Sequence, residues 1–240
     1  MNRTASEGAA LAGELRALTA AAPRARIALC PPFTALAAVN AALAGTPLLL
    51  GGQNLHAEAA GAWTGEISGS MLAAAGCRFV IVGHSERRHG LGEDDALVAR
   101  KLKAAQRDGL TPIVCVGETL LEREGDRTAE VLVRQVRACY EGLDADAARA
   151  TVIAYEPVWA IGTGKVASPA EAADSHRLIR ATLDRVVRPG LGAEIAILYG
   201  GSVNPGNAAS LFASDEIDGA LVGGASLEAA SFWRIVAAAG

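Results

Sequence analysis

The sequence predicts an α/β protein with a parallel sheet, of a size that fits a closed barrel of eight βα units. Short apolar runs recur along the chain without polar alternation, which indicates strands buried on both faces. Longer alanine-rich segments separate these runs, and strands that alternate with helices imply parallel pairing through helical crossovers. The chain has 240 residues and no linker or low-complexity tract, so we expect a single domain over residues 1–240.

The expected strands are seven apolar runs. They cover residues 27–30, 48–51, 79–83, 112–117, 151–156, 195–201 and 219–224. The chain opens instead on an amphipathic segment, Ser6 to Leu18, which is typical of a helix. A closed (β/α) barrel has eight strands, so we expect the first strand to be absent from this sequence.

Three later segments are expected to be helices, over residues 94–109, 129–143 and 169–187. The first of them ends at Gly109, a residue type common just past a helix. The last has Pro169 and Glu171 in its first turn, and Ser168 precedes them as a candidate N-cap.

Composition excludes several classes of function. The formal net charge is −4 at pH 7, so basic side chains are not in surplus and we expect no nucleic-acid partner. No run approaches the roughly 20 apolar residues of a membrane span, and the N-terminal segment lacks the apolar block of a signal peptide. The four cysteines lack zinc-like spacing and are expected to be reduced, buried thiols. We therefore expect a cytoplasmic protein without membrane contact.

A histidine follows the third apolar run in the stretch "IVGHSERR". His84 stands where Ser85-Glu86-Arg87 begin a helix, and the positive potential of a helix N-terminus lowers the pKa of an imidazole. A neutral ring can donate a hydrogen bond to a carbonyl oxygen and polarise it. The alternative is that His84 only caps the helix.

A carboxylate follows the fifth run in the stretch "AYEPVWAIGTGK". Glu156 can act as a general base if water is excluded around it, because burial raises a carboxyl pKa. Pro157 to Trp159 resemble a hinge and an apolar lid, while Gly162 and Gly164 offer free backbone N–H groups. The alternative is an ordinary turn residue before proline.

Glycines follow each of the last two runs, in "YGGSVNPGN" and "LVGGASL". Gly200-Gly201-Ser202 and Gly223-Gly224 could present backbone N–H groups to a phosphate at a helix N-terminus. The loops after the last two strands of a barrel are frequent phosphate sites. Either glycine turn alone is a weak signal, and the pair is stronger.

Together these segments resemble the triosephosphate isomerase family. "CPPFTAL" (30–36), "GGQNLHAEAAGAWTGEIS" (51–68) and "IVCVGE" (113–118) fit that family in the same order. The resemblance covers the chain from Met1 to Gly240. It implies a TIM barrel that interconverts dihydroxyacetone phosphate and D-glyceraldehyde 3-phosphate through an enediolate, in glycolysis and gluconeogenesis. It implies no metal or organic cofactor.

The resemblance also assigns roles. It makes Glu156 the catalytic base and His84 the electrophile, with Glu86 and Cys115 beside the site and Glu86 a candidate for a direct role. Residues 157–165 would form the lid. The substrate phosphate would be bound by four residues, Gly162, Ser202, Gly223 and Gly224. The segment Gln53 to Ile67 would dock into a second copy of the chain, with Thr64 near the neighbour's site, which implies a homodimer.

One feature of the family has no counterpart in this sequence. Its first strand carries an Asn-x-Lys pair whose lysine reaches the substrate, and Met1-Asn2 align just after that lysine. We expect either a start site assigned too late or a truncated sequence, which the in-frame DNA upstream of Met1 would reveal. Two alternatives to the isomerase stay open: an isomerase of a longer phosphorylated ketose such as erythrulose phosphate, and a catalytically impaired barrel that only binds phosphate.

Overall fold

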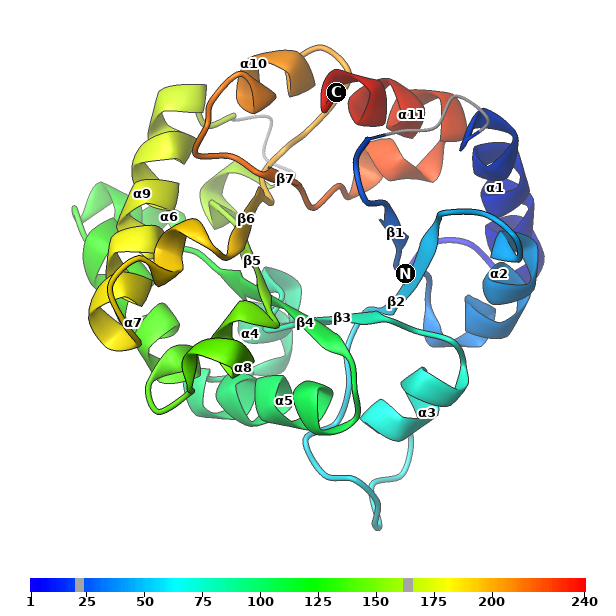
Figure 1. Ribbon diagram of the computed structural model, residues 1–240, viewed down its shortest axis with the longest axis horizontal. Helices are drawn as coiled ribbons and strands as arrows, with labels where there is room; N and C mark the ends of the chain where they lie inside the picture. Colours follow the sequence, from blue (N-terminus) through cyan, green and yellow to red (C-terminus); the bar gives the residue numbers. More distant parts are fainter. Residues whose placement is uncertain (20–23, 162–165) are drawn as a thin grey trace.

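The computed structural model describes residues 1–19, 24–161 and 166–240. In these residues one curled parallel sheet occupies the centre of the molecule (Figure 1). Its strands are β1 (Ala28–Leu29), β2 (Leu49–Gly52), β3 (Phe79–Val82), β4 (Thr111–Val116), β5 (Val152–Tyr155), β6 (Ala196–Tyr199) and β7 (Gly219–Ala220). Each strand pairs in parallel with its neighbours in the chain, in the order β1 to β7. The predicted strand positions and fold class are confirmed.

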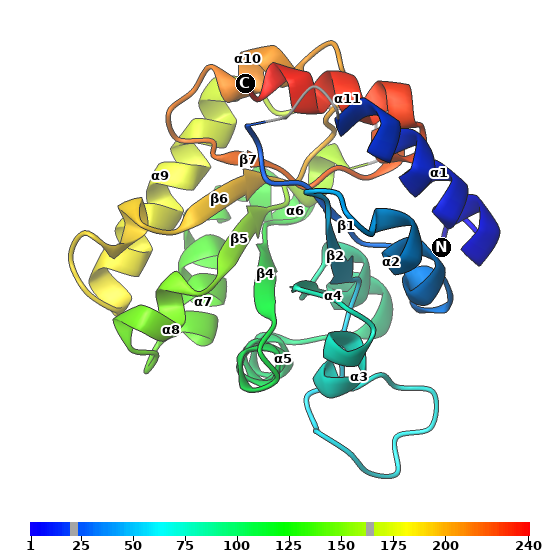
Figure 2. The same ribbon diagram turned by 45° about the vertical axis from the view of Figure 1, so that its right-hand side comes forward.

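Helices surround this sheet, as Figures 1 and 2 both show. The described helices are α1 (Ala5–Leu18), α2 (Leu36–Leu43), α3 (Gly69–Ala74), α4 (Ser85–Leu91), α5 (Asp95–Arg107), α6 (Leu120–Glu124), α7 (Thr128–Tyr140), α8 (Ala145–Arg149), α9 (Pro169–Val186), α10 (Ala208–Phe212) and α11 (Ala229–Ala238). Short 3-10 turns add η2 (Phe33–Ala35), η3 (Val158–Ala160), η4 (Leu191–Ala193) and η5 (Gly224–Leu227). No helix of the described residues is long and apolar enough to cross a membrane.

Local sequence signals explain where the longer helices begin and end. Ser168 caps α9 in a reciprocal capping box, in which its hydroxyl accepts the Glu171 N–H and the Glu171 carboxylate accepts the Ser168 N–H at 2.8 Å. Gly109 follows α5 with a φ of +74°, the left-handed conformation that glycine adopts without strain. Both predicted helix boundaries are confirmed.

Two apolar cores lie on the two faces of the sheet. Phe79, Ile81 and Ile113 point into the barrel interior, where they form one cluster. Val80 and Val82 belong to the larger cluster, which joins the sheet to the surrounding helices. All residues of β3 are buried, which explains why the strand sequence shows no polar alternation.

The sheet is open between its first and last strands. Among the described residues, β1 pairs only with β2 and β7 only with β6. Seven strands in the order of an eight-stranded barrel agree with the expectation from the sequence.

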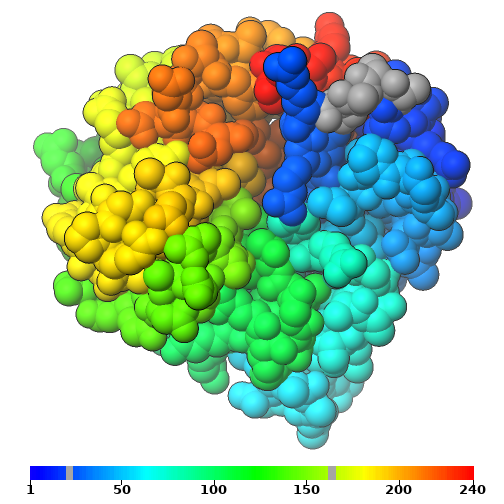
Figure 3. All heavy atoms as spheres, in the orientation of Figure 1, coloured from blue at the N-terminus to red at the C-terminus, as the bar shows by residue number. Residues whose placement is uncertain are grey.

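A long loop between β2 and α3 projects from the barrel. Residues 53–67 form this projection, which is cyan in Figures 1 to 3. At its base the His56 N–H donates to the Ile67 carbonyl at 2.8 Å. The Trp63 ring lies 4.3 Å from the His56 ring, and Trp63 remains 52% exposed.

Candidate active site

The carboxyl ends of the strands bring the predicted polar residues to one side of the barrel. His84 follows β3, Glu156 follows β5, and Ser202 follows β6. Parallel strands all end on the same side of a sheet, so side chains from distant parts of the sequence meet there. The site was predicted from the sequence to lie on this side of the barrel.

His84 and Glu156 are in direct contact. The His84 Nε2 atom lies 2.9 Å from Glu156 Oε1. The backbone N–H of Ser85 donates to the other carboxylate oxygen, Glu156 Oε2, at 2.8 Å. The Glu156 side chain is only 3% exposed and that of His84 is 26% exposed, so the carboxylate is buried and the ring borders solvent. The first residues of α4 therefore hold both oxygens of Glu156.

The other ring nitrogen of His84 fixes its tautomer. His84 is the N-cap of α4, and its Nδ1 atom accepts the Glu86 N–H at 3.3 Å. A nitrogen that accepts this hydrogen bond carries no proton, so the proton of a neutral ring is on Nε2. His84 thus caps the helix and also presents an Nε2–H donor to the site.

The protonation of His84 is balanced between opposing influences. Burial lowers the pKa of the ring, but the hydrogen bond and the charge of Glu156 raise it, and the balance lies above the ordinary value. Our prediction of a lowered pKa was wrong for this arrangement, because it considered the helix N-terminus without the carboxylate. The Glu86 N–H opposes protonation, since a protonated Nδ1 could not accept it.

Two glycines make room for Glu156, and their role was not predicted. A Cβ atom on Gly117 would lie 1.7 Å from the Glu156 carbonyl oxygen. A Cβ atom on Gly200 would lie 2.9 Å from Glu156 Cγ. Both distances are shorter than any real Cβ contact, so the ends of β4 and β6 are fitted to this residue.

The expected phosphate residues lie on the loops after β6 and β7. The Ser202 hydroxyl donates to the Ala160 carbonyl at 2.6 Å, which ties this loop to η3. Gly223 and Gly224 are exposed at the start of η5. Gly200 differs from expectation, because its N–H donates to the Tyr155 carbonyl at 2.7 Å and is not available to a phosphate. Gly162, with the remainder of residues 162–165 of the expected lid, lies outside the described residues.

The two supporting candidates lie in different surroundings. The Glu86 side chain is 83% exposed, with Oε2 3.9 Å from His84 Nδ1, so the closer contact of Glu86 with the ring is its backbone N–H. Cys115 is fully buried inside the barrel. Burial raises the pKa of the Cys115 thiol well above its ordinary value, and the Glu156 charge adds to this effect. Cys115 is therefore a neutral packing partner of the carboxylate.

A second buried carboxylate, Glu118, was missed by the sequence reasoning. Its side chain is fully buried and accepts hydrogen bonds from Trp159 Nε1 at 2.8 Å and from the Tyr155 hydroxyl at 3.1 Å. Burial raises the pKa of Glu118, and these donors oppose the rise. Glu118 thus anchors the residues on both sides of Glu156.

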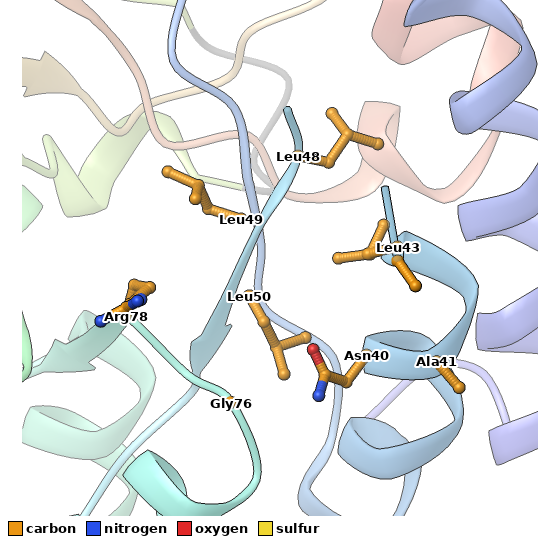
Figure 4. A pocket seen from close by; sticks show the side chains of 9 residues that line it. Asn40, Ala41, Leu43, Leu48, Leu49, Leu50, Gly76 and Arg78 are labelled. Atoms are coloured by element: carbon orange, nitrogen blue, oxygen red, sulfur yellow. The ribbon is translucent and has the colours of Figure 1, made fainter. Parts of the chain in front are cut away.

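A separate hollow lies away from these residues. It has a volume of about 360 Å³ and lies beside α2, at the amino ends of β2 and β3 (Figure 4). Its walls are mainly leucine and alanine, with Asn40 and Arg78 as polar side chains. None of the predicted site residues lines it. Within the described part of the chain, no group of three or more His, Cys, Asp or Glu residues could hold a metal ion.

The chain matches known sequences over nearly its whole length. A family model described as triosephosphate isomerase matches residues 1–239. The chain is 52% identical to the triosephosphate isomerase of Rhodopirellula baltica over 239 residues, which are 100% of this chain and 94% of the relative. It is 54% identical to that of Moorella thermoacetica over 236 residues, which are 98% of this chain and 94% of the relative.

A solved structure is similar as well. The crystal structure of triosephosphate isomerase from Bartonella henselae superposes with a TM-score of 0.87 and 41% sequence identity. The match covers 99% of this chain and 94% of that one.

Proposed function

The chain belongs to the triosephosphate isomerase family, and from that premise we propose that Glu156 is its catalytic base and His84 its electrophile. The chain is an isomerase that interconverts dihydroxyacetone phosphate and D-glyceraldehyde 3-phosphate, a step of glycolysis. The observation that carries the residue assignment is the 2.9 Å contact between His84 Nε2 and Glu156 Oε1. It joins the two groups that proton transfer next to a carbonyl requires.

The reaction begins with removal of a proton from C1 of dihydroxyacetone phosphate by the Glu156 carboxylate. The electron pair of that C–H bond forms the C1–C2 double bond, and the carbonyl electrons move onto the C2 oxygen. His84 Nε2–H donates a hydrogen bond to this oxygen and stabilises its developing charge. Glu156 then returns its proton to C2 while the proton of the C1 hydroxyl is transferred to the C2 oxygen, which leaves the C1 carbonyl and C2 hydroxyl of the aldose. C1 is oxidised and C2 is reduced within the same substrate molecule, so the reaction needs no external oxidant or reductant.

We propose that the Glu156 side chain moves from the position described above before it acts as the base. Oε1 contacts His84 Nε2 and Oε2 accepts the Ser85 N–H, so in this position Glu156 occupies the donor that the substrate carbonyl needs. When the Glu156 side chain turns away from α4, one of its oxygens can face the substrate. His84 Nε2–H is then free to donate a hydrogen bond to the substrate carbonyl. The same movement removes the carboxylate that raises the His84 pKa, while the Glu86 N–H keeps Nδ1 unprotonated. Glu86 therefore contributes through its backbone in this proposal.

The substrate phosphate is assigned to the loops after β6 and β7. Ser202, Gly223 and Gly224 are the proposed ligands, supported by their place on the same side of the barrel as Glu156 and by the exposed backbone of the two glycines. Gly162 joins them on the sequence pattern alone.

The proposed assembly is a homodimer formed through residues 53–67. This loop projects from the barrel and carries the exposed Trp63 and Thr64 (Figure 3). A large exposed aromatic on a projecting loop is typical of an interface residue. Sedimentation of the wild-type chain and of T64R tests the pairing. We expect a dimer that T64R converts to monomer; a monomeric wild-type chain at high concentration would reject it.

Two further points complete the proposal. We place residues 1–240 in one domain, supported by the continuous sheet, and we propose a cytoplasmic location, supported by the composition. Neither alternative function is favoured by the family match over nearly the whole chain. A coupled assay with dihydroxyacetone phosphate and erythrulose phosphate separates the readings. Turnover of the triose alone is expected, whereas preference for the four-carbon ketose, or phosphate binding without turnover, would favour an alternative.

A further inference from the structure

Arg123, on α6, contacts residues on both sides of the segment that follows Glu156. Its guanidinium lies over the Trp159 ring, 4.3 Å from the ring centroid. Its Nη2 atom pairs with Glu171 Oε1, and its Nη1 atom lies 3.6 Å from Glu118 Oε1. One side chain therefore joins η3 to the start of α9.

These contacts fix two short segments of the chain, which we call the first and second stems. The first stem, residues 157–161, leaves the sheet directly after Glu156, and the second stem, residues 166–168, returns to α9. The first stem is held at Trp159, whose Nε1–H donates to the buried Glu118. The second is held at Ser168 by the carboxylate of Glu171, the partner of Arg123.

The two carboxylate oxygens of Glu171 bind different partners. Oε2 accepts the N–H and the hydroxyl of Ser168, both at 2.8 Å, while Oε1 pairs with Arg123. The planar guanidinium can stack on an aromatic ring and donate to a carboxylate at the same time, which an ammonium group cannot do with the same geometry. Arg123 is thus the side chain that connects the two stems.

We propose that Arg123 is a positioning residue that fixes the two stems relative to each other and thereby sets where Glu156 lies. Glu156 is joined to the first stem through Pro157, and the Val158 N–H donates to the Glu118 carbonyl at 3.1 Å. A shift of the first stem therefore reaches the catalytic carboxylate within three residues. Misplacement of a reacting group by about 1 Å can cost on the order of 100-fold in rate. This inference rests on the role proposed for Glu156.

The test compares R123M, R123K and E171Q with a matched control, R137M. Arg137, on α7, also pairs with a glutamate, Glu141 at 3.4 Å, but both side chains of this pair are exposed. The E171Q side chain can still form the capping box while it loses the charge that Arg123 pairs with. All variants are made in a W233F background, which keeps Trp63 of the proposed interface, so that a change in emission reports Trp159 against the constant signal of Trp63, since the chain has three tryptophans.

For R123M we expect kcat to fall about 10-fold with KM changed less than twofold, because the reacting group moves while Gly223 and Gly224, on the separate loop after β7, stay in place. Trp159 emission should shift as the stacked cation is lost. R123K and E171Q should show smaller losses of kcat in the same direction, and R137M should match the parent. Assays are run below the melting temperature of every variant.

The inference is overturned if R123M keeps kcat within twofold of the parent, or if R137M loses as much. If R123M does not fold, R123K and E171Q decide in its place, and parental kcat in both would reject the positioning role. E156Q is measured beside them. Turnover retained in E156Q would reject the proposed function, whereas an inactive E156Q with an unaffected R123M would reject the role of Arg123 alone.

Discussion

Gly200 lies so close to Glu156 that a Cβ atom at residue 200 would come within 2.9 Å of Glu156 Cγ. The same Cβ would lie 3.1 Å from the Tyr155 carbonyl oxygen, so it would have backbone on one side and the carboxylate on the other. The end of β6 therefore forms a wall of the space in which the catalytic side chain lies. The absence of a side chain at residue 200 is what leaves that space open.

The G200A variant should therefore displace Glu156. We expect kcat/KM to fall about 100-fold, as a small misplacement of a reacting group produces. G13A is the matched control, because a Cβ atom on Gly13 of α1 would meet nothing within 4 Å. Steady-state kinetics of the two variants measures the difference. Full activity in G200A would show that the wall does not set the position of Glu156.

The G117A variant should affect folding as well as activity. The added Cβ would meet the backbone oxygen of Glu156 at 1.7 Å, and backbone cannot rotate away as a side chain can. We expect the free energy of unfolding to fall by about 3 kcal/mol or more. Urea denaturation of G117A beside wild type checks this, and equal midpoints would contradict it.

The H84Q variant tests the electrophile. Glutamine still has an amide N–H, but it lacks the ring and the Nδ1 atom through which the Glu86 N–H places the donor, so the donor is no longer preorganised. Loss of one preorganised donor to a developing oxyanion lowers kcat by about 100- to 1,000-fold. Kinetics of H84Q and of a control at the exposed His89 provide the measurement. A kcat in H84Q within fivefold of wild type would remove His84 from the mechanism.

His176 makes stability depend on pH. The ring is fully buried, and burial lowers its pKa to about 4, although its Nδ1–H···O hydrogen bond to the Glu216 carbonyl partly offsets this. An unfolded histidine has a pKa of about 6.5, so between these values only the unfolded chain binds the proton. The stabilising contribution is therefore complete above about pH 6.5 and is lost as pH falls towards 4.

The expected loss approaches about 3 kcal/mol near the lower end of this window. It is measured as the free energy of unfolding in urea at several pH values between 7.5 and 4.5. The H176Q variant should show a smaller slope against pH over the same range. An identical slope in both proteins would exclude His176 as the source.

Much of the fold could be predicted because its strands are buried on both faces. Runs such as residues 79–83 carry no polar alternation, and short runs of this kind are typical of a parallel sheet covered by helices. The long helices were found for a similar reason, since helices such as α9 have a capped start and a periodic apolar face. The short helices were missed, because five residues, as in α6, are too few to show a period.

The site was predicted in part because its residues directly follow buried strands. His84 and Glu156 are polar residues directly after apolar strands, and parallel strands bring such positions together. Contacts that depend on tertiary packing were not predictable. Glu118 meets Trp159, 41 residues away along the chain. Gly200 was expected to donate its N–H to a phosphate, but that N–H continues the sheet to Tyr155, and its missing Cβ matters instead.

The most direct test of the central claim is the reaction of E156Q in D₂O. Glutamine keeps the shape of the side chain and an oxygen that can accept the Ser85 N–H, but it cannot take a proton from carbon. We predict that wild type incorporates solvent deuterium at the carbon next to the carbonyl, and that E156Q loses both this exchange and turnover by about 1,000-fold, while inorganic phosphate still binds. Exchange and turnover in E156Q within tenfold of wild type would contradict the assignment of Glu156 as the base.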